Sequence, residues 1–142
     1  MKTISFELPI YTYQIDFLGH VSNIVYVQWM EIGRHRLLED MGLPIDRIAG
    51  EGIVPVLVYT EIDYRTPLFL GDRVRLDMWL SELRHASARI EFRFHRNGET
   101  LTALGSQRGL FVHRETMRPY RMPREFREAF EPYLADHPGG SE

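Results

Sequence analysis

The sequence predicts an α+β fold in which one curled antiparallel sheet of five strands wraps around one long central helix. Three observations predict it: an apolar period of three and four residues early in the chain, alternating apolar and polar residues later, and a strong turn signal between two alternating segments. A single long helix cannot hide its apolar stripe alone, so strands that are apolar on one face are expected to wrap it.

The chain opens with a segment that reads as extended, Ile4 to Tyr13. Pro9 cannot donate a hydrogen bond to a neighbouring strand, which favours a position at the sheet edge. A loop from Gln14 to Ser22 follows. The apolar residues after this loop recur at helical spacing: Tyr26, Trp29, Met30, Gly33, Leu37 and Met41.

The predicted helix runs from about Asn23 to Met41. Ser22 or Asn23 can cap its start, and Gly42 followed by Pro44 can end it. Four strands are expected after it. Their sequences are VPVLVYTEIDY, DRVRLDMWL, SARIEFRFHR and LTALGSQRGLFVH, with Asn97-Gly98 as the turn between the last two.

A short terminal helix is expected in REFREAFEPYL, residues 124–134. Neither an internal repeat nor a linker divides the sequence, so residues 1–142 are expected to form a single domain. A net charge of −3 gives no indication of nucleic-acid binding.

The composition excludes several kinds of site. The chain has no cysteine, so disulfides, a thiolate nucleophile and a cysteine-based zinc site are excluded, and its six histidines show no metal-ligand spacing. We expect no cofactor. No apolar stretch approaches the roughly 18 residues of a membrane span, and the opening MKTISFELPI lacks a signal-peptide apolar region. A cytoplasmic protein without membrane partners is therefore expected.

The loop before the helix, DFLGHVSN, contains the candidate catalytic motif. Together with TEIDYRTPLFLGDRV and RPYRMP it resembles the hotdog-fold acyl-CoA thioesterases of the 4-hydroxybenzoyl-CoA thioesterase and YbgC-like kind, over about Ile10 to Arg127. The resemblance implies an enzyme that hydrolyses acyl-CoA to the free acid and CoA. It also implies a homodimer or homotetramer with the site between protomers, which suits a sheet with an open edge.

The resemblance implies that Asp16 is the catalytic group, as nucleophile or general base. The Asn23 N–H is the implied oxyanion donor at the positive end of the helix. Backbone donors of this kind are typically worth about 3–4 kcal/mol in acyl transfer. Gly19 allows the loop backbone to approach closely, and His20 and Tyr26 complete the implied site. Gln14 stands where relatives often carry a second polar or acidic residue.

CoA phosphates need basic partners, and arginine can bind them bidentately. The family stretches that hold such residues correspond here to LRHAS and RPYRMP. They give Arg84, His85, Ser87, Arg118 and Arg121 as candidate nucleotide contacts, each with a solvated side chain as the alternative.

Other interpretations stay open. Asp16 could be an ordinary loop acid, His20 a structural histidine, and Tyr26 part of the core. Glu31 could be a catalytic acid on the helix, but it stands three residues from Arg34 and can simply pair with it. Among functions, the alternatives are an acyl-acyl carrier protein thioesterase, a non-catalytic acyl-CoA-binding module and a dehydratase that would use Glu31 with a histidine.

Overall fold

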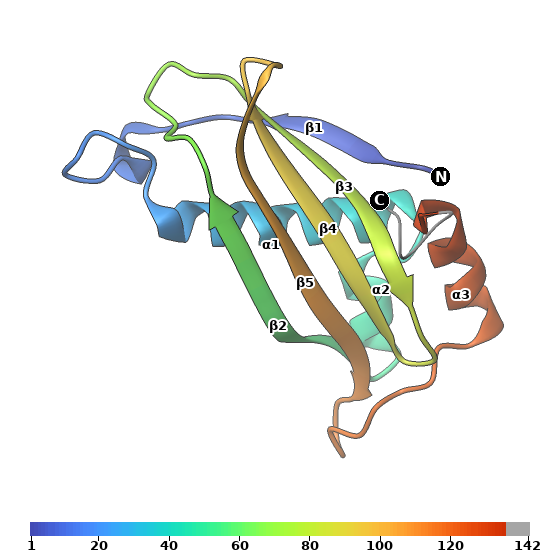
Figure 1. The fold of residues 1–142 in the computed structure, drawn as a ribbon. Helices are drawn as coiled ribbons and strands as arrows, with labels where there is room; N and C mark the ends of the chain where they lie inside the picture. The colour runs from blue at the N-terminus through green and yellow to red at the C-terminus, as the bar shows by residue number, and fades with distance from the viewer. Residues whose placement is uncertain (136–142) are drawn as a thin grey trace.

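The computed structural model describes residues 1–135, which form one five-stranded antiparallel sheet crossed on one face by a long helix (Figure 1). The spatial order of the strands is β1-β3-β4-β5-β2, so β1 and β2 are the two edges. The strands are β1 (Ile4–Leu8), β2 (Ile53–Tyr64), β3 (Val74–Leu83), β4 (Ser87–Arg96) and β5 (Thr100–His113). The predicted α+β architecture is confirmed.

The opening strand is shorter than predicted. It ends at Leu8 rather than Tyr13, because the chain turns after Pro9 into a 3₁₀ turn, η1 (Thr12–Gln14). Its edge position is confirmed, since among the strands of residues 1–135 β1 pairs with β3 alone.

The long helix α1 (Asn23–Asp40) begins at the predicted residue and ends one residue before the predicted Met41. Its apolar stripe packs against the sheet, and Gly33 marks the closest approach. A Cβ added at Gly33 would lie 2.5 Å from Sδ of Met78, so glycine lets the helix backbone come this near β3 without displacing the buried Met78 side chain. Ser22 occupies the N-cap position, but its side chain makes no capping hydrogen bond.

The predicted alternation in the strands is confirmed. Val74, Leu76, Met78 and Leu80 of β3 are fully buried, as are Phe92 and Phe94 of β4. Asn97 and Gly98 both take positive φ and form the predicted turn between β4 and β5.

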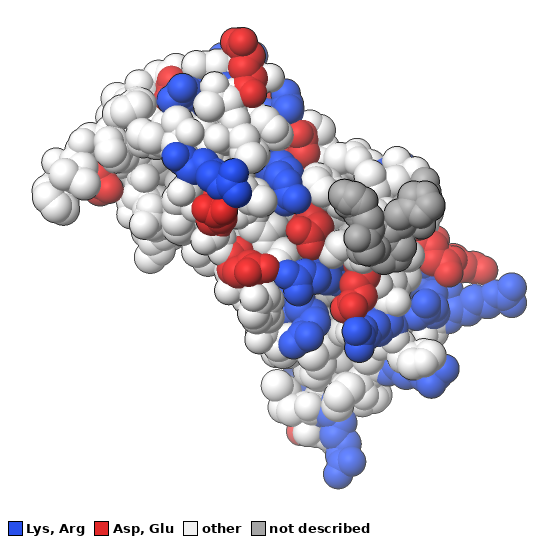
Figure 2. Space-filling model, in the orientation of Figure 1, with Lys and Arg blue, Asp and Glu red and all other residues white. Residues whose placement is uncertain are grey.

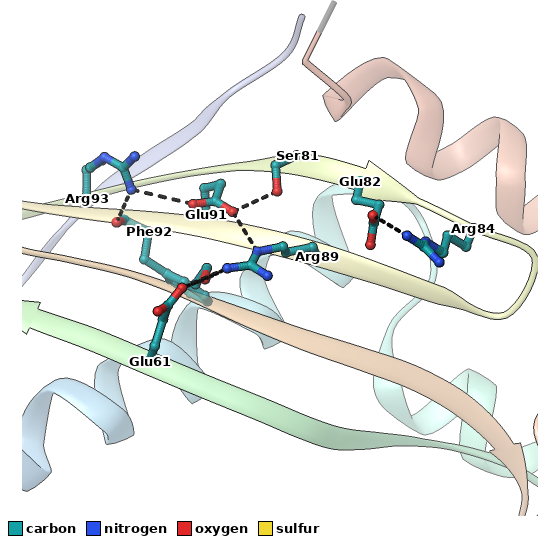
Figure 3. A network of polar contacts seen from close by, with 9 residues as sticks. Glu61, Ser81, Glu82, Arg84, Arg89, Glu91, Phe92 and Arg93 are labelled. Carbon is teal, nitrogen blue, oxygen red and sulfur yellow. Dashed lines mark hydrogen bonds and ion pairs between the residues drawn. The ribbon is translucent and has the colours of Figure 1, made fainter. Parts of the chain in front are cut away.

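The opposite face of the sheet carries charged side chains that pair with one another (Figure 3). Arg89 lies 2.7 Å from Glu61 and 3.4 Å from Glu91, and Ser81 donates to Glu91 at 2.7 Å. Because these ion pairs are partly solvated, they contribute little to the stability of the fold.

Two features were not predicted. A short helix, α2 (Ile45–Gly50), follows α1, and the terminal helix is divided into α3 (Arg124–Phe130) and the 3₁₀ turn η2 (Glu131–Tyr133). Across residues 1–135, no helix has the length and apolar character needed to cross a membrane.

Candidate active site

The loop that carries Asp16 is fixed by backbone hydrogen bonds at both of its ends. Ile15 and Val21 form an isolated antiparallel bridge. Ser22 N donates to Gln14 O at 2.9 Å, and Val21 N donates to Leu68 O at 2.8 Å. The Gln14 side chain is buried and accepts from Tyr11 N at 2.7 Å. Gln14 therefore supports the loop rather than facing a substrate.

Asp16 is held by the loop that it stands in. Its Oδ1 accepts from Leu18 N at 2.9 Å and from His20 N at 3.1 Å, while its backbone N donates to His20 O at 2.7 Å. Gly19 takes a φ of +85°, which lets the chain fold back on Asp16. Within residues 1–135 nothing donates a hydrogen bond to Oδ2. One carboxylate oxygen is thus oriented while the other stays available.

The start of α1 offers backbone donors beside this loop. The first bond of the helix runs from Val25 N to Ser22 O at 3.0 Å. The N–H groups of Asn23 and Ile24 find no acceptor in the part of the chain that the structure describes. Because Ser22 leaves them uncapped, these N–H groups and the helix dipole make a site for developing negative charge.

His20 and Tyr26 have different surroundings. The half-buried His20 ring packs edge-on against Phe69, with the ring centroids 5.1 Å apart. Tyr26 is only 3 % exposed and touches the rings of Trp29, Tyr64 and Phe94. Burial raises the pKa of Tyr26 to about 12. The structure favours the core interpretation of Tyr26 over a substrate contact.

The predicted nucleotide contacts lie at the other end of the molecule. Arg84 and His85 form the turn between β3 and β4, next to the loop that carries Arg118 and Arg121 (Figure 1). Met122 N donates to His85 O at 2.8 Å and joins the two segments. Basic side chains, which are arginines here because Lys2 is the one lysine of the sequence, gather at this end (Figure 2). Arg84 pairs with Glu82 at 2.9 Å here (Figure 3).

An apolar cavity of about 220 Å³ opens at this same end, between α1, the start of β2 and the facing ends of β4 and β5. Predicted contact Ser87 lines it. Its apolar walls come from Leu37, Leu38, Val56, Leu57, Ala88, Ile90, Leu110, Phe111, Met122 and Phe130, and its polar rim from Glu31, Arg34 and His35.

The predicted pairing of Glu31 with Arg34 is wrong. Arg34 Nη1 instead donates to Oε1 of Gln107 at 2.6 Å, and no ion pair joins Arg34 to a carboxylate within residues 1–135. Burial lowers the pKa of Arg34, and the nearby charge of Glu31 opposes this shift. Sequence reasoning missed the contact because Gln107 is 73 positions away. One signal in the sequence could have indicated this contact: Arg34 stands on the helix among the buried positions Met30, Gly33 and Leu37.

Comparison with known proteins shows which family the chain matches. The model of the thioesterase-like superfamily matches residues 10–130. A Bacillus subtilis protein, YneP, named as a candidate acyl-CoA thioesterase, is 23% identical over 87% of each chain. The Arabidopsis thaliana chloroplast acyl-acyl carrier protein thioesterase ATL3 is 28% identical, over 90% of this chain and 67% of its own.

Solved structures share the fold. The DHNA-CoA thioesterase of Staphylococcus aureus superposes with a TM-score of 0.87 at 18% identity, covering 93% of this chain and 91% of the other. The hypothetical protein TT1821 of Thermus thermophilus gives 0.84 at 27% identity, covering 91% and 98%. These likenesses confirm the curled-sheet fold.

Proposed function

Because the chain belongs to the thioesterase-like superfamily of hotdog-fold proteins and is a thioester hydrolase, we propose that it cleaves acyl-CoA through Asp16. The observation that carries this proposal is one carboxylate oxygen oriented by loop amides beside a helix start with unpaired N–H groups. The pair supplies the two elements of thioester hydrolysis: an acceptor or nucleophile, and donors for the oxygen that becomes negative.

Asp16 could hydrolyse the thioester by either of two routes. As a nucleophile, Asp16 Oδ2 attacks the thioester carbon, CoA thiolate leaves, and water then hydrolyses the mixed anhydride to the acid and free carboxylate. As a base, Asp16 takes a proton from water while the water oxygen attacks, and the proton passes to the leaving sulfur. In both routes the carbonyl oxygen gains charge toward the Asn23 N–H.

A second protomer is needed in this proposal because one chain keeps its two half-sites apart. Strand β2 is an open edge, and Leu57, Val58 and Tyr59 at its centre are 39 to 47% exposed. Pairing of two β2 strands about a twofold axis would cover this apolar edge and its free backbone groups.

Such a twofold brings the half-sites together. Antiparallel pairing about the strand centre sets Tyr64 opposite the partner's Ile53. The Tyr64 hydroxyl donates to Asn23 O at 3.1 Å, so the start of α1 lies at that end of β2. Pro55–Leu57 line the cavity, which lies roughly 7–13 Å along the strand at about 3.3 Å per residue. Asp16 of one protomer would therefore act on an acyl group held in the other.

The carrier is CoA in this proposal. The arginines beside the cavity suit the CoA phosphates, and the YneP relative carries an acyl-CoA thioesterase name. The rival carrier is an acyl carrier protein, which the names of the Arabidopsis relatives favour.

A turnover assay that measures thiol release from matched acyl-CoA and acyl-acyl carrier protein tests both. We expect turnover of acyl-CoA with a higher kcat/KM. If the protein hydrolyses acyl-acyl carrier protein and not acyl-CoA, the carrier is the acyl carrier protein. If it binds both thioesters and hydrolyses neither, it is a non-catalytic binding module.

A further inference from the structure

We propose that Arg34 selects acyl groups that end in a carboxylate, so that the substrates are CoA monothioesters of short dicarboxylic acids. This inference rests on the proposed function and assigns a specificity-determining residue within the same site.

The first argument is that, within residues 1–135, no carboxylate forms an ion pair with the positively charged Arg34. Arg34 lines an apolar cavity, and its half-buried guanidinium bonds to the neutral Gln107, with no carboxylate within 4.0 Å in the part of the chain that the structure describes. A cation removed from water in this way is costly unless an anion meets it. A ligand carboxylate would be that anion.

The second argument is that the guanidinium is held in place. Gln107 has no exposed surface, its Nε2 donates to Thr60 Oγ1 at 3.2 Å, and its Oε1 accepts from Arg34 Nη1. The Thr60 contact sets which end of the Gln107 amide faces the arginine. Within residues 1–135 the guanidinium bonds through Nη1 alone, so Nε and Nη2 are in place to bind both oxygens of a carboxylate. Gln107 is thus a positioning residue for Arg34.

The neighbouring acid sets a limit on this selectivity. Glu31 lies on the rim of the same cavity and is exposed, and His35 stands one turn further along α1. The Glu31 charge favours protonated Arg34 but repels an incoming carboxylate. Removing that charge should therefore strengthen carboxylate selectivity, which is the opposite of the effect of removing Arg34.

The third argument is size and distance. The cavity of about 220 Å³ suits a short acyl chain, such as the adipoyl group, which has seven non-hydrogen atoms beyond its thioester carbon. Arg34 stands eleven residues after Asn23 on α1, or roughly 16 Å at 1.5 Å per residue. An extended chain of seven atoms spans only about 8 Å. The acyl group held by Arg34 would thus reach the partner's catalytic loop, not the loop of its own chain.

The test compares adipoyl-CoA, hexanoyl-CoA and 6-hydroxyhexanoyl-CoA, which share chain length and differ in the terminal group. We expect kcat/KM for adipoyl-CoA to exceed both others at least tenfold. Arg34→Met should lower the adipoyl-to-hexanoyl ratio at least tenfold, mainly through KM. Arg34→Lys should restore part of the ratio, and Glu31→Gln should raise it.

Arg36→Met is the matched control. This arginine lies two residues further on the same helix, over the Phe6 ring and outside the cavity, so the ratio should not change. Thermal unfolding checks each variant. If Arg34→Met does not fold, the opposite shifts expected for Arg34→Lys and Glu31→Gln decide the question.

Three results would overturn the inference: equal turnover of adipoyl- and hexanoyl-CoA, equal preference for the neutral hydroxyl, or a ratio that survives Arg34→Met. In each case acyl-CoA hydrolysis still stands. Failure of the protein to hydrolyse any acyl-CoA would overturn the proposed function itself, and this inference with it.

Discussion

The two ends of the sheet differ in what they contain. The end near Asp16 has an oriented carboxylate and uncapped helix amides, but its surroundings are open, and the Phe17 side chain is 96% exposed. The end near Arg84 has an apolar cavity and several arginines, but its acids are engaged or exposed on the rim. In the proposed function, catalysis takes place at the first end and substrate binding at the second.

In the proposed function, this separation means that one chain holds two incomplete halves of a site. The rigid helix α1 fixes the halves far apart, so no local movement of a loop can join them. Twofold pairing through β2 is the simplest arrangement that joins each half to its complement. The predictions below test the catalytic half, the pairing, the binding half and the core that separates them.

The largest effect is expected at the catalytic half. Asp16→Asn keeps the size of the side chain and its hydrogen-bond acceptor for Leu18 N and His20 N, but it removes the nucleophile or base. Loss of general-base help alone typically costs about 10²–10⁴ in rate, so kcat should fall by that factor in steady-state assays.

Glu31→Gln is the comparison variant, because Glu31 is the rival acid on the helix. It should retain hydrolysis, and both variants should melt close to the wild-type temperature. A fully active Asp16→Asn beside a folded but inactive Glu31→Gln would move catalysis from the loop to the helix.

The next effect is expected at the pairing edge. Val58 lies at the centre of β2, so in a twofold dimer Val58→Asp would bring like charges together across the axis. Light scattering at micromolar concentration should give a dimer or tetramer for the wild type and a smaller species for the variant, with at least tenfold lower kcat/KM. Thr3→Asp, an exposed position just before β1 at the opposite edge of the sheet, should change neither. A wild-type monomer of 16.7 kDa would refute the pairing.

A smaller effect is expected at the binding half. Arg84→Ala and Arg121→Ala should each raise KM for acyl-CoA severalfold, because each removes a proposed phosphate contact. An acyl-pantetheine thioester lacks these phosphates and should be turned over almost as before. Arg73→Ala, which removes an exposed arginine paired with Glu7, is the control. Equal losses on both substrates would assign Arg84 and Arg121 a structural role.

The smallest effect concerns the core at high pH. Burial raises the pKa of Tyr26 from 10.0 to about 12, so the folded state favours the neutral phenol. This stability is present below pH 10 and is lost as the pH rises through 12. Tyr26→Phe should therefore unfold less steeply between pH 10 and 12 than the wild type, as followed by circular dichroism. The exposed Tyr13→Phe should not differ from the wild type.

Much of the fold was predictable because its signals are local. The spacing of Trp29, Gly33 and Leu37 predicted α1, and Asn97-Gly98 predicted the turn between β4 and β5. Helix α2 was missed because six residues after Pro44 are too few to show a helical period.

The proposed catalytic half of the site could be predicted from one continuous motif, since Asp16, Gly19 and Asn23 lie within eight residues. The contacts of the proposed binding half could not be predicted in this way. The contact of Arg34 with Gln107 joins a helix to a strand 73 positions later. Helical spacing predicted that Arg34 would pair with Glu31, but in the folded chain Arg34 contacts Gln107 instead. The separation of Asp16 from Arg84 likewise depends on strand order, which periodicity alone does not give.

The most direct test of a site shared between protomers is complementation of two inactive variants. Asp16→Asn removes the catalytic half, and Ala86→Trp fills the cavity of the binding half. Each alone should be nearly inactive. Mixed, unfolded and refolded together, they should recover about a quarter of wild-type activity, because half of the dimers are mixed and each of these has one intact site. No recovery in a mixture shown by mass spectrometry to contain mixed dimers would place Asp16 and the cavity of the same chain in one site and contradict this account.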